Sequence, residues 1–333
     1  MPAVRRIGRI GAVGAAVTVA IAGAALAAPG ITTVVAPASV SKPAVRLTPP
    51  GPKVGGCSVF PADNAWNADV SSLPLHPRSA QIVAKINSVG GRSFHPDFGS
   101  DPTYGIPFVV VPADQPLVPI TYTAYGDESD PGPFPIPLTA PVEGGPSADG
   151  DRHVLAVQQG TCQLFELYRA FPANRGWAAD SGARWDLGTG ALRPLGWTSA
   201  DAAGLPILPG LVRIDEVQSG AIRHALRVTF AQTRRGYVLP ATHAASSRTD
   251  QDLPPMGLRL RLSASFDLSG FTGQALVVAT AMQRYGLIVA DNGSNWFVSG
   301  QSSPLWDDDD LNQLKAIPGT AFEVVDTGPV LGT

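Results

Sequence analysis

The sequence predicts a mainly β fold, a β-sandwich of the jelly-roll or lectin-like type with two or three short peripheral helices. Short runs rich in Val, Ile, Leu, Thr and aromatic residues recur along the chain, and 36 glycines and 32 prolines supply turns between them. The stretch 151–170 shows the alternation of a β-hairpin. Few segments repeat apolar residues at helical spacing. An α+β fold is the alternative.

The beginning of the chain is not expected to belong to this fold. Three arginines precede an uncharged apolar run that ends in Ala-Leu-Ala, which is typical of a secretory signal peptide over 1–27. Residues 28–56 are rich in Pro and Ala and predict a disordered linker. Residues 57–333 are predicted to form a single β-rich domain. We therefore expect a secreted, extracellular protein.

The first part of the domain is predicted to combine strands with one helix. A serine caps apolar residues at helical spacing, so a helix is expected over 79–88. A turn is expected at 95–99, and strands are expected over 105–112 and 117–124. Residues 127–137 are acidic and then proline-rich, which predicts a rigid loop and a candidate wall of a site.

The hairpin 151–170 carries the candidate catalytic residues. A two-residue turn around its central glycine would set His153 opposite Glu166 and Asp151 opposite Tyr168, all on one face. Hydrolysis of a glycosidic bond needs two carboxyl groups, and a histidine beside a carboxylate holds a proton near neutral pH. These four residues are therefore predicted to be catalytic. The alternative is an ordinary His–Glu pair at a solvated sheet end.

The middle of the chain is predicted to cross the domain in a fixed, irregular segment. Residues 193–213 are apolar but broken by glycines and prolines, so they suit neither a regular helix nor a loose loop. A short strand is expected before them, at 182–187. A hairpin formed by 221–230 and 235–243 is expected after them.

The last part is predicted to hold two helices and several strands. In 256–262 leucines alternate with Arg259 and Arg261, which predicts a strand with the arginines facing outward. The remaining elements follow in order: helix 272–285, hairpin 287–298 turning at Asn292-Gly293, helix 307–316 and strand 322–326.

Tryptophans beside polar side chains predict a sugar-binding groove. Sugar rings stack on indoles while amides bind hydroxyl groups, so Trp66, Asn295 and Trp296 are candidate substrate contacts. Core packing is the alternative for these tryptophans. His224 lies beside apolar residues and is expected to be a packed histidine, with a substrate contact as the alternative.

A second group of residues suggests a different chemistry. Arg235, Tyr237 and His243 together provide what β-elimination of a uronic acid requires. The arginine would neutralise the carboxylate, and the histidine and tyrosine would move protons. This group supports a polysaccharide lyase as an alternative enzyme. Ordinary amphipathic alternation is the other interpretation.

The two cysteines of the chain, Cys57 and Cys162, predict one disulfide because the expected compartment is oxidising. Neither cysteine has a nearby Cys or His at metal-ligand spacing. The disulfide would close a loop of roughly 100 residues.

Charge and motifs disfavour several functional classes. The chain has 24 basic and 27 acidic residues and no basic stripe, which disfavours nucleic-acid binding. It lacks P-loop, GxGxxG, HExxH and GxSxG motifs. The acidic run Asp307–Asp310 suits a helix start better than a calcium site. We expect a monomer with no cofactor, no metal and no membrane association after signal cleavage.

Three segments resemble those of a widespread, largely uncharacterised family of secreted bacterial proteins. They are GWTSADAAGLP at 196–206, GAIRHALR at 220–227 and RYGLIVADNGS at 284–294. The resemblance covers most of the chain after Cys57. It implies secretion and one intact domain, and it transfers no catalytic residue.

The combined expectation is a secreted carbohydrate-active enzyme, a glycoside hydrolase that cleaves an extracellular polysaccharide or cell-wall glycan by carboxylate acid/base chemistry. The alternatives are a polysaccharide lyase and a non-catalytic glycan- or cell-wall-binding protein.

Overall fold

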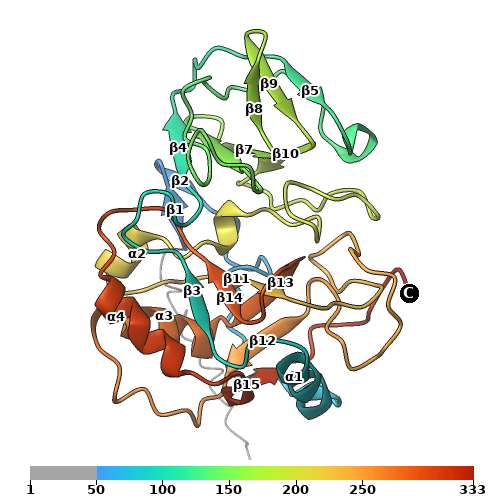
Figure 1. The fold of residues 1–333 in the computed structure, drawn as a ribbon, viewed down its shortest axis with the longest axis vertical. Helices are drawn as coiled ribbons and strands as arrows, with labels where there is room; N and C mark the ends of the chain where they lie inside the picture. Colours follow the sequence, from blue (N-terminus) through green and yellow to red (C-terminus); the bar gives the residue numbers. More distant parts are fainter. Residues whose placement is uncertain (1–50) are drawn as a thin grey trace, which may run out of the picture. The chain divides into compact units, whose positions relative to one another are not determined.

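The computed structural model describes residues 51–333 (Figure 1). The predicted signal peptide and residues 28–50 of the predicted linker lie outside the described residues. Strand β1 (Lys53–Val54) pairs with β2 (Cys57–Ser58), so the fold already includes the last residues of the predicted linker.

The prediction of a mainly β, sandwich-like fold is confirmed. Beside the β1–β2 pair, residues 51–333 form three larger sheets. The six-stranded sheet has the order β15 (Phe322–Val324), β12 (Arg259–Leu262), β13 (Leu287–Asn292), β11 (Leu226–Phe230), β14 (Phe297–Ser299), β3 (His95–Asp97). The four-stranded sheet has the order β10 (Ser181–Asp186), β7 (Gln163–Tyr168), β6 (Val154–Gln158), β4 (Phe108–Val111). The three-stranded sheet has the order β5 (Ile120–Tyr122), β9 (Gly176–Ala179), β8 (Phe171–Ala173).

The helices are few and short. α1 packs beside β15, and α3 packs beside β12 (Figure 1). No helix in residues 51–333 is long and apolar enough to cross a membrane. The α-helices are α1 (Ser79–Ser88), α2 (Ile214–Gln218), α3 (Gly273–Arg284) and α4 (Asp308–Asn312), and the 3-10 turns are η1 (Gly126–Glu128), η2 (Leu208–Gly210), η3 (Gln313–Ala316) and η4 (Gly319–Ala321).

The core forms two clusters. The larger one joins the six-stranded sheet, the helices and one face of the β6–β7 hairpin, through side chains such as Leu155 and Leu164. The smaller one packs the other face of that hairpin, including Ala156 and Phe165, against the three-stranded sheet. Because β6 is buried on both faces, all five of its residues are buried.

The predicted register of the β6–β7 hairpin is wrong. Leu155, not His153, lies opposite Glu166, and Val157 lies opposite Leu164. The last pair before the turn is Gln158 with Gln163, so the turn contains four residues instead of two. The two extra residues keep each side chain on its predicted face but move Glu166 toward the core.

Two other predicted hairpins are also wrong. The strands at 287–298 do not pair with each other, because β11 lies between β13 and β14. The segment 235–243 forms no strand and does not pair with β11. Both errors arise from long-range pairing, which a local turn signal does not report.

Two smaller expectations also need correction. The turn expected at 95–99 contains strand β3, which pairs with β14. Arg259 was expected to face outward but is 3% exposed. Its guanidinium donates to the carbonyl groups of Tyr285, Ala65 and Ala68, which replaces the water it would otherwise bind.

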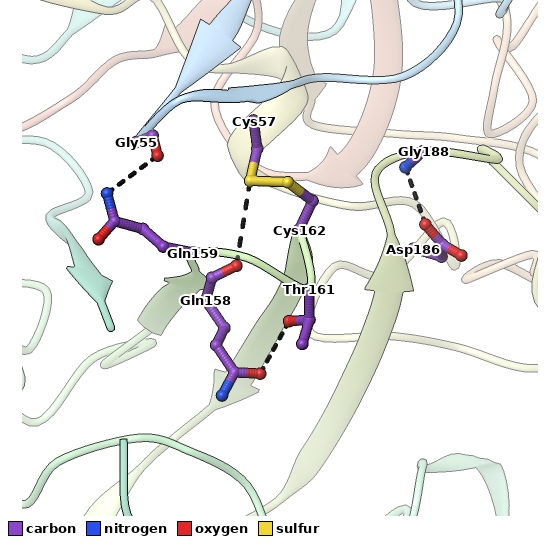
Figure 2. Close-up of a disulfide and its surroundings, with 8 residues drawn as sticks. All are labelled: Gly55, Cys57, Gln158, Gln159, Thr161, Cys162, Asp186 and Gly188. Carbon is purple, nitrogen blue, oxygen red and sulfur yellow. Dashed lines mark hydrogen bonds between the residues drawn. A yellow bond between two sulfur atoms is a disulfide. The ribbon is translucent and has the colours of Figure 1, made fainter. Parts of the chain in front are cut away.

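The predicted disulfide joins Cys57 to Cys162, which lie 105 residues apart (Figure 2). It ties β2 to the turn of the β6–β7 hairpin. The same turn is held by Gln159, whose side-chain amide donates to the Gly55 carbonyl at 3.0 Å. Thr161 closes the turn by donating to the Gln158 side chain at 2.9 Å.

Candidate functional site

A polar cavity of about 400 Å³ opens on one face of the six-stranded sheet. Strands β13, β11, β14 and β3 supply one side, and residues 143–153, which lead into β6, supply the other. The register of these four strands pairs Asp291 with Thr229, Thr229 with Phe297, and Phe297 with His95. The strand register therefore sets them in one row.

The sequence of β13 explains how a carboxylate reaches this cavity. Residues 287–290 are apolar and buried, whereas Asp291 and Asn292 are progressively more exposed. On β11, Arg227 and Thr229 alternate with apolar residues that fill the core. Strand alternation therefore points the arginine and the threonine to the same side.

Arg227 organises the charges of the cavity. Its Nε and NH2 groups donate to the two carboxylate oxygens of Asp201 at 2.7 and 2.8 Å. Its NH1 group donates to Ser299 Oγ at 2.6 Å, and NH2 also donates to Asp291 Oδ2 at 3.3 Å. Such a buried arginine stays protonated and fixes both carboxylates in place.

Asp291 is suited to hold a proton near neutral pH. Its side chain is 24% exposed, so it is largely desolvated but still reachable from the cavity. Burial, with a smaller contribution from the negative charge of Asp201, raises the pKa of Asp291 to about 7. Arg227 opposes this rise but is mainly engaged by Asp201.

Glu143 and His153 form an ion pair on the opposite side of the cavity. The ring Nδ1 of His153 lies 2.6 Å from Glu143 Oε2, and its backbone N–H donates to the same oxygen at 3.2 Å. Burial works against both charges. However, the Glu143 carboxylate raises the pKa of His153 to about 9, and His153 in turn holds the pKa of Glu143 below its usual value. Glu143 is therefore ionised at neutral pH.

Asp97 is a third carboxylate in the cavity, and burial raises its pKa. It lies on β3, three strands away from Asp291 on β13. Three strand spacings place the two backbones about 14 Å apart. Glycosidase carboxylates lie roughly 5–10 Å apart, which does not favour Asp97 as the partner of Asp291.

A second cavity of about 300 Å³ adjoins the first. Both are lined by Asp151, Asp291 and Asn292, so these residues lie at their junction. The second cavity is also lined by Tyr125, Tyr168, His243 and residues 198–202. The crossing segment predicted at 193–213 therefore contributes part of the site, and much of it is buried and fixed as expected.

Three of the four predicted catalytic residues lie at these cavities. Asp151 and His153 line the first, and Tyr168 lines the second, with its ring centroid 5.7 Å from that of His153. Glu166 lines neither cavity and is fully buried. The prediction of a catalytic Glu166 therefore needs correction, because no substrate can reach it.

The oxygens of Glu166 are already occupied by protein donors. Oε1 accepts from the backbone N–H groups of Ile207 at 3.0 Å and Leu208 at 2.9 Å. Oε2 accepts from Ile207 at 3.0 Å and from the Trp185 indole at 3.2 Å. Burial raises the pKa of Glu166 to about 7, although the bonds from Leu208 and Ile207 lower it. Glu166 anchors the crossing segment at η2.

The predicted sugar-binding groove is not formed. Trp66 and Trp296 are 1% and 0% exposed and belong to the core. Asn295 is buried, donating to the Ile86 carbonyl at 2.7 Å and accepting from Ala231 N–H at 2.8 Å. His224 is the packed histidine of the favoured interpretation, with its Nε2 2.8 Å from Glu216.

The predicted lyase group is not brought together at the cavities. Tyr237 is buried and forms isolated bridges with Met256 and Leu331. Arg235 is exposed and lines neither cavity. Only His243 reaches the site, in the second cavity.

Sequence reasoning missed Asp291, Arg227, Asp201 and Glu143 as site residues. The first three lie in the three segments that carry the family resemblance, which transfers no role to them. Asp291 follows four apolar residues without a break, which is a detectable sign of a carboxylate delivered by a buried strand. Glu143 lies between glycine-rich and proline-rich turns and carries no comparable sign.

The described residues contain no group of three or more His, Cys, Asp or Glu side chains arranged to hold a metal ion. The acidic run at 307–310 acts at a helix start instead. Asp307 caps α4 by accepting from the Asp310 N–H at 3.0 Å. Capping of this kind satisfies a backbone donor that the helix leaves unpaired.

No known family, curated protein or solved structure matches this chain. The resemblance noted in the sequence therefore stays an expectation.

Proposed function

We propose that the cavity around Asp291 is the active site of a glycoside hydrolase that acts on a polysaccharide outside the cell. The observation that carries the proposal is the convergence of Asp291 and Glu143 on one open cavity, each beside its own cationic partner. Glycoside hydrolysis uses one protonated and one ionised carboxyl group.

The two carboxyl groups have environments suited to these two roles. Burial keeps Asp291 protonated up to about pH 7, so it serves as the general acid that gives its proton to the leaving oxygen. Glu143 is ionised, and His153 binds only its Oε2 atom among the described residues. Oε1 of Glu143 serves as the second carboxylate, acting on a water molecule or on the anomeric carbon.

Arg227 and Asp201 act as positioning residues in this scheme. Their paired hydrogen bonds fix the guanidinium that contacts Asp291, so the acid keeps one orientation. His153 does the same for Glu143, and its Nε2 lies 3.1 Å from the Ala200 carbonyl, which fixes the ring. Such supporting contacts are what hold a catalytic geometry.

A polysaccharide lyase is less well supported. That reaction needs a cation to neutralise a uronate carboxyl group. Arg227 is already bonded to Asp201, Ser299 and Asp291, and Arg152 donates to the backbone carbonyl groups of Ala170, Pro146 and Ala148. The predicted Arg235 lies away from both cavities. The disulfide is the observation that supports an extracellular location.

The experiment is reducing-end release from a panel of plant and microbial polysaccharides by wild type, Asp291→Asn and Glu143→Gln. Absorbance at the wavelength of unsaturated uronates is followed in parallel. Release by wild type that falls at least 100-fold in both variants is expected. The matched control is Asp267→Asn, a carboxylate that accepts only from nearby Ser269.

Two outcomes would contradict the hydrolase. Absorbance of unsaturated products would indicate the lyase. Glycan binding without release of any product would indicate the binding protein.

A further inference from the structure

The second cavity presents unused hydrogen-bonding groups beside Asp291. Within residues 51–333, the phenol hydroxyls of Tyr125 and Tyr168 have no hydrogen-bond partner. The ring of His243 engages the Ala202 carbonyl through Nδ1 at 2.7 Å, which leaves Nε2 available. Two aromatic rings with free polar atoms in a concave site are suited to a sugar ring and its hydroxyl groups.

The loop that carries Tyr125 is held firmly against the crossing segment. Glu128 accepts from the Thr198 backbone N–H at 2.9 Å. Arg193 donates to the Glu128 carbonyl at 2.8 Å and to the Asp130 carboxylate at 2.5 Å. The acidic part of the loop predicted at 127–137 thus fixes a wall of the second cavity, although its residues do not line that cavity themselves.

The two cavities meet at the proposed general acid. Asp151, Asp291 and Asn292 line both of them, so a ligand that fills both passes over Asp291. A bond positioned at Asp291 would then have a sugar unit on each side. An enzyme that removes only terminal sugars needs a single closed pocket instead.

The charge of the junction bears on which chains fit. Asp151 and Asp291 lie there, and Glu143 and Asp97 line the first cavity only. The cations that line the first cavity are already bonded: Arg227 and His153 to carboxylates, and Arg152 to the backbone carbonyl groups of Ala170, Pro146 and Ala148. An anionic chain would therefore meet the carboxylates of Asp151 and Asp97, which form no ion pair within residues 51–333, while an uncharged chain would meet hydrogen-bonding groups.

We propose that the two cavities are successive subsites for one uncharged glycan chain, which is cut internally at Asp291, with Tyr125 binding the sugar in the second cavity. This inference rests on the proposed function and adds the substrate class and the mode of cleavage.

The experiment uses the mature protein on soluble neutral polymers (arabinan, xylan, galactan and mixed-linkage β-glucan) and on two anionic polymers, polygalacturonate and alginate. Reducing ends and molar-mass distribution are measured on the same samples. Internal cleavage of a neutral polymer is expected, with a sharp early fall in molar mass and products of two or more sugars. The anionic polymers are expected to stay intact.

The variant Tyr125→Ala tests the second cavity. We expect its KM for the cleaved polymer to rise about tenfold and its kcat to stay within about threefold, because in this proposal Tyr125 binds its sugar equally in the ground and transition states, and loss of such uniform binding raises KM alone. Tyr125 is 49% exposed, so the variant should fold normally, which its Tm checks. Leu305→Ala, a 59% exposed residue outside both cavities, is the control.

The outcomes separate this inference from the proposed function. Cleavage with unchanged kinetics in Tyr125→Ala, release of monosaccharide alone, or cleavage of the anionic polymers overturns the inference and leaves the hydrolase standing. No cleavage of any polymer by the wild type overturns both.

Discussion

Replacing Glu166 with glutamine separates a structural carboxylate from a catalytic one. The side chain is fully buried, and both of its oxygens accept from N–H groups of Ile207, Leu208 and Trp185. Glutamine has the same shape but replaces one oxygen with an NH2 group. The new NH2 group would face the N–H of either Leu208 or Trp185, depending on which oxygen it replaces. The NH2 group and the N–H are both donors, so both would be left without an acceptor.

The expected cost follows from this mismatch. A buried polar group left without its partner costs about 1–3 kcal/mol. For a domain of this size, a loss of that order lowers Tm by about 2–10 °C. Because Glu166 lies outside both cavities, the folded fraction should keep its activity.

The assay combines thermal unfolding with the rate of reducing-end release well below Tm. Asp151→Asn is the matched control for Tm, because Asp151 is exposed and belongs to the same predicted catalytic set. Its Tm should stay within about 1 °C, as is usual for an exposed substitution. A Glu166→Gln protein with unchanged Tm and abolished activity would refute the structural role.

Three further predictions concern stability. The pKa of His153 is raised from its usual 6.5 to about 9 in the folded protein. The stability that its pair with Glu143 contributes is therefore complete below about pH 6.5 and is lost as pH rises toward 9. The loss in the free energy of unfolding is on the order of 3 kcal/mol. Urea unfolding at pH 6 and pH 9 measures this loss, and a His153→Gln protein that keeps the full slope would contradict it. Replacing both disulfide cysteines with serine opens a loop of 105 residues and should lower the free energy of unfolding by about 4–5 kcal/mol. The loss is measured as a lower midpoint of urea unfolding, and an unchanged midpoint would contradict a stabilising role of the disulfide. Asp201→Asn leaves the buried guanidinium of Arg227 without its paired carboxylate, so the free energy of unfolding should fall by about 3–5 kcal/mol. Urea unfolding measures this change, and a loss below about 1 kcal/mol would show that the pair is not essential.

Local sequence signals predicted several elements well. Ser79 with Ile82, Val83 and Ile86 has the spacing of one buried helix face, and the observed helix is Ser79–Ser88, as predicted. The disulfide followed from two cysteines in an oxidising compartment. In both cases the decisive interactions lie within a few residues or leave no other partner.

The candidate site depended on information that the local sequence does not carry. A two-residue turn would set Glu166 at the open end of the hairpin, but the turn has two more residues, which bring Glu166 into the core. Asp291 and Thr229 became neighbours because β11 inserts between β13 and β14. Strand insertion is settled by long-range packing, so an Asn-Gly turn signal alone could not exclude a hairpin.

The measurement that tests the central claim most directly is the pH dependence of kcat/KM for wild type and Asp291→Asn on the cleaved polysaccharide. The proposed acid must be protonated, and its pKa is raised to about 7. Wild-type kcat/KM should therefore fall as pH rises through about 7, and Asp291→Asn should lose at least 100-fold together with that limb. Full activity in Asp291→Asn, or a wild-type rate that climbs from pH 7 to pH 9, would contradict the assignment.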